Sequence, residues 1–199
     1  MGKNEFDVRV ATAADIPALG ELIEQSVRVL QAADYTQAQM DGALGTLLGV
    51  DSQLIADGTY FVVEASADDG VAQIVACGGW SKRRTLFGAD RRADREDDLL
   101  DPAKEAAKIR AFFVRPGWER RGIGTLLLSM CENAAADAGF SRFELGSTLT
   151  GVALYRERGY EELERIHAPL PNCETLEIVK MRKSARQAKF EIRSKFLRG

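Results

Sequence analysis

The chain has 199 residues, enough for one domain with a sizeable core, and 45% hydrophobic with 29% charged residues is typical of a soluble globular protein. The formal net charge of −3 gives no indication of a nucleic-acid partner. No stretch has the length and apolar content of a membrane span, and residues 1–10 lack the apolar core of a signal peptide, so we expect a cytoplasmic protein without a membrane partner.

Cysteine spacing and charge distribution set two further expectations. Cys77, Cys131 and Cys173 fit no zinc motif, which favours reduced thiols and no metal. The end of the chain is basic, with seven basic residues and one acidic residue in 182–199, whereas the body is acidic. We therefore predict a single domain over residues 1–183 and a basic C-terminal tail over residues 184–199.

The first third of the chain predicts a strand followed by helices. Residues 6–10 alternate apolar and polar side chains as a half-buried strand does. A helix is expected from Asp15, as its cap, to about residue 32, with Pro17 in its first turn. A weaker helical pattern over residues 35–48 is interrupted by glycines.

Residues 59–65 and 71–80 predict an antiparallel hairpin, joined by the turn-forming cluster at 66–70. Trp80 fits a core position and a cleft wall equally well. Residues 81–107 are irregular, with small alternating blocks of acid and base, and the default interpretation is a solvated, partly mobile excursion. Such an excursion can also cover the mouth of an active site.

The stretch from residue 108 to 139 organises the rest. Residues 109–114 predict a strand, and apolar positions from 122 to 138 recur at the spacing of one buried helical face, up to Gly139. At the join, first-turn N–H groups lack intrahelical partners, and two glycines let a bulky anion approach the backbone. A phosphate or pyrophosphate is the ligand that this join favours, and the residues concerned are Arg120, Arg121, Gly122, Ile123, Gly124 and Thr125.

Other phosphate motifs fit this join less well. A dinucleotide fingerprint requires glycine where Leu127 stands, and the Gly-Lys-Ser/Thr of a Walker loop is absent. An ordinary surface turn that uses glycine for tightness is the remaining alternative.

The final third predicts three more strands, at 142–147, 161–166 and 175–181, with a helix after Thr148 or Thr150 that stops at Gly159. The prolines of the 169–172 connection exclude a helix there. His167 is the single histidine, and a surface position is favoured over a catalytic one because no acid–base neighbour lies close in sequence.

Two runs together resemble the GNAT superfamily of acetyl-CoA-dependent N-acetyltransferases. Residues 114–124, VRPGWERRGIG, resemble its acetyl-CoA motif, with Glu119 where Gln or Arg is usual. Residues 154–160, LYRERGY, resemble its second signature, with Leu149 in place of a common Asn. The resemblance implies an α/β (α+β) fold: a mixed, mostly antiparallel sheet of six to seven strands, about four flanking helices, and a splayed strand pair at the cofactor.

The resemblance also implies site residues. The backbone of Phe112, Phe113 and Val114 is expected to pair with the pantetheine arm of acetyl-CoA, and the nest at 120–125 to bind its pyrophosphate. Tyr155 matches the general acid that protonates the thiolate. Ser26, Arg28 and Tyr35 are loose candidates for substrate contact, because the first two helices form a wall of the acceptor cleft in this superfamily.

The implied reaction is acetyl transfer to a primary amine of a small molecule or peptide, with homodimer formation left open. No general base can be assigned: the predicted strand 109–114 contains no acid, and Glu64, Asp101, Glu144 or a water chain remain open. Two alternatives also remain. One is an acyl-CoA-binding sensor without catalysis, and the other is an interaction protein that recruits an acidic partner through its basic tail and charged loop, with CoA in a structural role.

Overall fold

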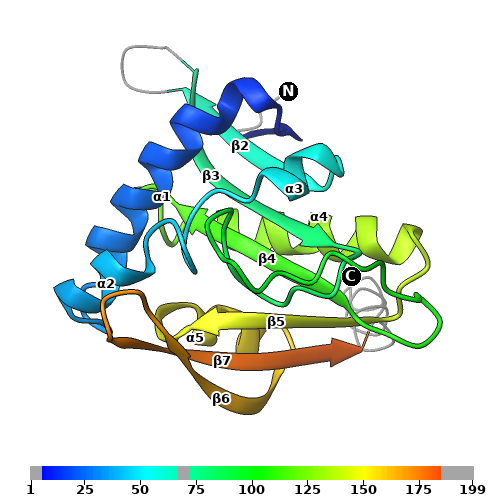
Figure 1. The fold of residues 1–199 in the computed structure, drawn as a ribbon. Helices are drawn as coiled ribbons and strands as arrows, with labels where there is room; N and C mark the ends of the chain where they lie inside the picture. Colours follow the sequence, from blue (N-terminus) through cyan, green and yellow to red (C-terminus); the bar gives the residue numbers. More distant parts are fainter. Residues whose placement is uncertain (1–5, 67–71, 185–199) are drawn as a thin grey trace.

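The computed structural model describes residues 6–66 and 72–184. One seven-stranded sheet lies between two layers of helices (Figure 1). The strands are β1 (Asp7–Val10), β2 (Tyr60–Ser66), β3 (Ala72–Ser81), β4 (Ala107–Val114), β5 (Arg142–Thr148), β6 (Glu161–Pro169) and β7 (Thr175–Ser184). The helices are α1 (Ile16–Leu30), α2 (Gln37–Ala43), α3 (Ser52–Ala56), α4 (Ile123–Asp137) and α5 (Val152–Glu157), with short 3-10 turns at Ala13–Asp15 and Leu149–Gly151.

The sheet order is β1-β2-β3-β4-β5-β7-β6, and every neighbouring pair is antiparallel except β4 and β5. This confirms the predicted α/β fold with a mostly antiparallel sheet. The turn expected at 66–70 lies, apart from Ser66, outside the described residues. So does the basic tail, apart from Ser184, the last residue of β7.

Each face of the sheet has its own core. On one face α1, α2 and α3 bury Leu22, Met40 and Leu54 against strand residues such as Val62. On the other face α4 and α5 cover the sheet, so that these two helices lie behind it in Figure 1. The apolar stripes read from the sequence therefore point inward on both layers.

Local details differ from the sequence-based expectations. Asp15 does not cap α1 through its side chain; its carboxylate instead accepts hydrogen bonds from the Thr12 N–H (2.7 Å) and from Arg9 (2.8 Å). Neither Thr148 nor Thr150 caps a helix through its hydroxyl, and the Thr150 hydroxyl donates to Asp34. The pattern over 35–48 gives a helix only to Ala43, and α3 was not predicted.

The excursion at 82–106 is anchored to the body at several points, although most of its side chains from 90 to 99 are exposed, as the solvated interpretation expected. Thr85, Ala89 and Leu100 are buried, and the Ala89 N–H donates to the Thr46 carbonyl at 2.7 Å. An ion pair of 2.7 Å joins Arg83 to Asp57 after α3. Long-range partners hold this segment against α3, and the alternating charges in the sequence do not reveal them.

Two negative findings concern only residues 6–66 and 72–184. No helix there combines the length and the apolar content that crossing a membrane requires. Likewise, that part of the chain contains no cluster of three His, Cys, Asp or Glu side chains arranged to hold a metal ion.

Candidate active site

A cleft of about 440 Å³ lies where β4 ends and α4 begins, with the end of α1 and the start of α5 on its other sides. It brings together side chains that are more than a hundred residues apart, such as Ser26 and Tyr155. Among the residues predicted from the sequence, the cleft is lined by Phe112, Phe113, Val114, Arg120, Gly122, Ile123, Gly124, Thr125 and Tyr155.

The backbone before α4 has a left-handed turn and an open approach from the cleft. Arg120 and Gly122 adopt left-handed conformations, with φ of 65° and 81°. A Cβ placed on Gly122 would have no heavy atom within 4 Å, so the backbone there faces open space. Because α4 starts at Ile123, the amides of its first turn have no intrahelical partner, and the helix dipole adds partial positive charge.

Side chains beside this nest have distinct roles. The Glu119 carboxylate accepts the Gly117 N–H at 2.6 Å and so closes the preceding turn. The Arg121 guanidinium lies 4.6 Å from the centre of the Trp118 ring, a cation–π contact. Within the described part of the chain Arg120 lines the cleft and Arg121 does not. Arg120 is therefore the predicted arginine that borders the nest directly.

β4 and β5 separate beside the nest, as the family resemblance implied. Their parallel pairing covers only Ala107–Ile109 with Phe143–Leu145. Ala111 then has φ of 55°, and the register between β3 and β4 shifts, so β4 bends through a bulge. The edge of β4 that faces the gap is left open to hydrogen-bond an extended ligand as a strand would.

Tyr155 on α5 stands at this gap. It is 8% exposed and makes edge-to-face contacts with Phe112 (6.3 Å between ring centres) and Tyr160 (5.7 Å). Burial raises the pKa of the Tyr155 hydroxyl well above its ordinary value near 10, and the nearby Cys131 adds to that rise. The phenol therefore keeps its proton throughout the neutral range.

Sequence comparison identifies the family to which this arrangement belongs. The family model described as "Acetyltransferase (GNAT) family" matches residues 25–160, which include the cleft, the nest and Tyr155. The chain belongs to the GNAT acetyltransferase family. Acetyl transfer from acetyl-CoA is the reaction of that family in general.

Solved structures support the GNAT fold. A GCN5-related N-acetyltransferase from Rhodopseudomonas palustris is similar over 92% of this chain and 98% of its own, with 19% identity and a TM-score of 0.64. A ribosomal-protein-alanine N-acetyltransferase from Brucella melitensis matches 89% of this chain and 99% of its own (20% identity, TM-score 0.58). A putative acetyltransferase from Salmonella typhimurium, solved with its cofactor acetyl-CoA, matches 92% and 95% (17% identity, TM-score 0.58). No curated protein matches the chain in sequence.

We call the 440 Å³ cleft at the start of α4 the GNAT cleft. A second, smaller cavity of about 90 Å³ adjoins it. Both cavities are lined by Gln31, Phe112, Phe113, Thr148, Gly151 and Tyr155, so they meet at the gap between β4 and β5. The smaller one is closed by residues 47–49 and 86–88 and contains Arg110. We call it the acceptor-side cavity; Gln31, residues 47–49 and part of the excursion form its wall, on the face of the sheet opposite the α4 nest.

Sequence reasoning missed Gln31 and Arg110. Gln31 follows directly after α1, and nothing in the pattern distinguishes it from the polar residues beside it. Arg110 did carry a signal: it is a charged residue inside an otherwise apolar strand, and such a residue is normally paired when it is buried.

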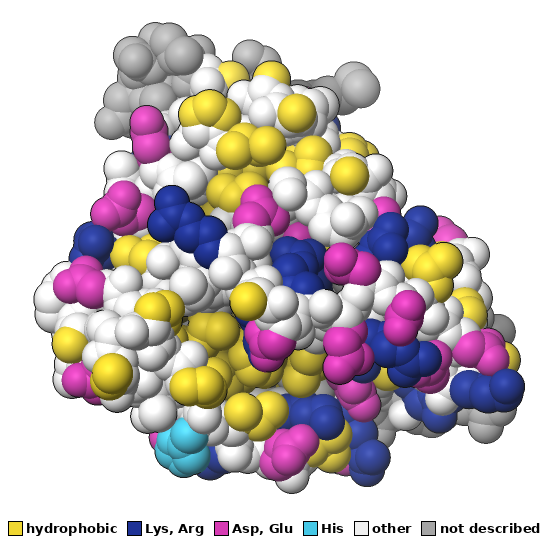
Figure 2. Space-filling model, viewed as in Figure 1, with side chains coloured by type: hydrophobic (Ala, Val, Ile, Leu, Met, Phe, Trp, Pro, Cys, Tyr) yellow, Lys and Arg dark blue, Asp and Glu magenta, His cyan; other side chains and the backbone are white. Residues whose placement is uncertain are grey.

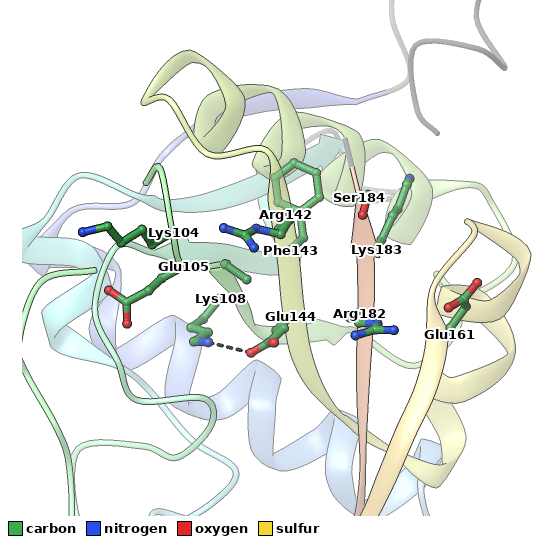
Figure 3. A pocket seen from close by; sticks show the side chains of 11 residues that line it. Lys104, Glu105, Lys108, Arg142, Phe143, Glu144, Glu161, Arg182, Lys183 and Ser184 are labelled. Carbon is green, nitrogen blue, oxygen red and sulfur yellow. Dashed lines mark hydrogen bonds and ion pairs between the residues drawn. The ribbon is translucent and has the colours of Figure 1, made fainter. Parts of the chain in front are cut away.

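The candidate bases lie elsewhere. Glu64 pairs with Arg9 at 2.7 Å, and Asp101 contacts Lys104. Glu144 pairs with Lys108 at 2.7 Å in a separate charged cleft of about 470 Å³, at the opposite end of β4 and β5 (Figure 3). Of the described residues that line the acceptor-side cavity, none is a carboxylate or a histidine.

The remaining candidates are also placed. Ser26 is buried and lines the GNAT cleft, whereas Arg28 pairs with Glu24 and Asp41 on the surface. The buried Tyr35 hydroxyl accepts the Leu149 N–H (2.8 Å) and donates to a β7 carbonyl (2.7 Å), which ties the 3-10 turn before α5 to the sheet.

Trp80 lies in the core and His167 on the surface. Trp80 packs edge-to-face on Phe140 in the core, which settles its two alternatives in favour of the core. His167 is exposed on β6, in agreement with the surface position favoured by the sequence.

Proposed function

We propose that the chain transfers the acetyl group of acetyl-CoA to a primary amine by direct attack, with both substrates bound together. The observation that carries this proposal is the convergence of three features on one cleft: the α4 nest, the open edge of β4 and the buried Tyr155. An acetyl-CoA site requires an anion cradle, a backbone partner for an extended arm and a proton donor, and this cleft offers all three.

Acetyl-CoA supplies an activated thioester, and the residues of the chain hold and polarise it. The amides from Gly122 to Thr125, with Arg120 beside them, are the groups that would bind the pyrophosphate. The backbone of Phe112–Val114 would pair with the pantetheine arm. A backbone N–H of β4 near the bulge would then donate to the carbonyl oxygen and stabilise the charge that develops there.

Tyr155 would supply the proton that the departing thiolate needs. The amine nitrogen forms its bond to the carbonyl carbon, the C–S bond breaks, and the sulfur takes the phenolic proton. The proton lost by the amine then restores the phenol through water. Because burial raises the Tyr155 pKa, the phenol is a weak acid, so we expect its contribution at the low end of general-acid catalysis.

The amine would enter from the acceptor-side cavity, where the unpartnered Gln31 Oε1 can accept one of its N–H bonds. Since no carboxylate or histidine is among the described residues lining that cavity, we assign proton removal from the amine to water. The acceptor is a small-molecule or peptide amine, without a nucleic-acid or membrane partner.

Calorimetric titration with acetyl-CoA and CoA, followed by thiol release on a panel of primary amines, tests the proposal. We expect micromolar or tighter CoA binding, together with amine-dependent thiol release. Binding without release on any amine would favour a sensor, and absence of binding would contradict the site itself.

A further inference from the structure

The acceptor-side cavity has a mixed chemical character. It lies over the gap between β4 and β5, on the face covered by α1 and the excursion, where Figure 2 shows an apolar hollow bordered by charged side chains. Leu47, Leu86, Phe87 and Ile178 form its apolar walls. Against these walls stand one guanidinium and one amide, those of Arg110 and Gln31.

Arg110 is buried in this cavity with part of its hydrogen-bonding capacity unused. Its side chain is 2% exposed. Nη2 donates to the Gly88 carbonyl at 2.6 Å and lies 2.8 Å from Asp51 Oδ2. Nε, in contrast, is buried and has no partner. A buried donor without a partner is costly, so a ligand that accepts from Nε would be favoured.

The carboxylate that faces Arg110 is shared with a second arginine. Asp51 is fully buried and is shared by two guanidiniums, since Arg95 Nη2 lies 2.9 Å from its other oxygen. The acids that also approach Arg95, Asp90 at 3.7 Å and Asp97 at 4.0 Å, are exposed and therefore screened by water. Arginine stays protonated in proteins, and Arg110 is the one charged side chain among the described residues that line the cavity, so an anionic ligand is favoured there.

Gln31 presents a hydrogen-bond acceptor, whereas Arg110 presents a donor. The residue is 6% exposed, and its Oε1 atom is buried without a partner. It lines both cavities, so it stands between the acceptor-side cavity and the cleft proposed for acetyl-CoA. An amide oxygen at that junction can accept an N–H from an amine that approaches the gap.

We infer that the acceptor is a small amino acid with an apolar side chain, whose carboxylate pairs with Arg110 and whose amine faces Gln31 and the gap between β4 and β5. The inference rests on the proposed acetyl transfer and names the substrate class of that same site. One molecule then satisfies both unpartnered atoms and places its hydrocarbon part against Leu47, Leu86 and Phe87.

The dimensions favour a free amino acid over a peptide. A cavity of about 90 Å³ holds a compact molecule. A peptide carries an uncharged amide where a free amino acid carries its carboxylate, so the N-terminal residue of a peptide has no anion to offer Arg110. It would bury the guanidinium without compensating its charge.

The test compares three amines of matched shape: leucine, leucinamide and 3-methylbutylamine. Thiol release is measured on the full chain, and kcat/KM is expressed per neutral amine, because the amide and the amino acid differ in amine pKa. We expect leucine to exceed leucinamide by about 10- to 100-fold, the usual worth of a hydrogen bond to a charged group.

Substitution then assigns the preference to Arg110. In Arg110→Met the leucine-to-leucinamide ratio of kcat/KM should fall to about one. The control is Arg84→Met. Arg84 is an exposed arginine of the excursion that pairs with Glu105, so its removal should leave the ratio unchanged. If Arg110→Met does not fold, the wild type decides: with CoA present, N-acetylleucine should raise its melting temperature more than N-acetylleucinamide does.

Three outcomes would overturn the inference. The first is equal kcat/KM for leucine and leucinamide, and the second is a preference for a peptide that begins with leucine; both leave acetyl transfer in place. The third, no CoA binding and no thiol release on any of the amines, would overturn the proposed function and the inference with it.

Discussion

Gly122 is the residue at which the cofactor site can be tested most directly. Its left-handed φ of 81° and the open space beside it mean that a side chain there would project into the cleft without striking the protein. Gly122→Glu places bulk and negative charge where we propose the pyrophosphate. We expect the CoA dissociation constant to rise at least ~100-fold, measured by calorimetry, since both steric exclusion and like charge oppose binding.

A matched control separates this effect from backbone strain. Gly117 also has a left-handed φ (86°) and nothing within 4 Å of a built Cβ, but it does not line the cleft. Gly117→Glu should therefore lose a similar ~1–2 kcal/mol of stability and keep its CoA affinity. If both variants bind CoA as the parent does, the nest is not the pyrophosphate site.

Tyr155 carries the catalytic part of the proposal. Tyr155→Phe keeps the ring contacts with Phe112 and Tyr160 but removes the hydroxyl, so CoA affinity should hold while turnover falls roughly 10²-fold. Because burial raises the phenol pKa, loss of its proton should not lower the wild-type rate at any pH below about 10.

Tyr160→Phe is the control for Tyr155. It deletes a buried hydroxyl that donates to Glu132 at 2.9 Å in the adjoining core, outside the described lining of both cavities. It should lower stability and leave turnover nearly unchanged. If Tyr155→Phe stays within about twofold of the parent rate, less than ~0.5 kcal/mol at the transition state, the tyrosine serves packing only.

At the scale of elements, the local patterns were sufficient for the strands of the sheet and for the glycine turn at the start of α4. Strand alternation and the helical period place all seven strands and the long helices α1 and α4, because these signals come from one buried face. The glycines at the start of α4 are a local signal too. α3 was missed because five residues, Ser52–Ala56, are too few to show a helical period.

The acceptor side could not be predicted, because it depends on contacts between distant segments. The excursion becomes a cavity wall through pairs such as Arg95–Asp51, which join residues 44 positions apart, and no local pattern encodes that pairing. The bulge at Ala111 places a non-glycine residue at φ 55°, a conformation that its sequence context does not suggest.

Asp51 should be the residue that secures the excursion. Asp51→Asn keeps the shape of the side chain but leaves Arg95 and Arg110 facing each other in the interior without their shared counter-charge. We expect the free energy of unfolding, from urea titration, to fall by about 3–5 kcal/mol.

Asp97→Asn provides the comparison for Asp51. Asp97 approaches the same Arg95 at 4.0 Å but is 60% exposed, so its loss should cost no more than ~0.5 kcal/mol. Equal losses in the two variants would show that the buried pairing contributes nothing beyond a surface ion pair.

For the whole molecule, the buried hydroxyls and thiols predict a loss of stability in alkali. Burial raises the pKa of Cys77 to about 12 and those of Tyr60, Tyr155 and Tyr160 above their ordinary value. The unfolded chain then loses its protons first, from about pH 8.5 for cysteine and about 10 for tyrosine. The stabilising effect is complete below those values and disappears as pH rises through the raised ones.

Urea titrations at fixed ionic strength from pH 7 to 11 measure this effect. The free energy of unfolding should be level up to about pH 8 and then decline. Cys77→Ala should be less stable at pH 7 because it leaves a cavity, but its decline should be shallower. A decline of equal steepness in both proteins would show that the thiol does not contribute.

The short pairing of β4 with β5 has a consequence for the sheet as a mechanical unit. In the described chain, β4 and β5 pair only through three residue pairs, Ala107–Ile109 with Phe143–Leu145. The two halves of the sheet, β1–β4 and β5–β7–β6, are therefore hydrogen-bonded to each other at one end only. An extended ligand bound along β4 would occupy the gap where the two strands are not paired and would link the two halves of the sheet. Under the proposed function, saturation a hundredfold above the dissociation constant would add about 2.7 kcal/mol to the stability of the domain. The protein would then be most resistant to unfolding when its acetyl donor is abundant.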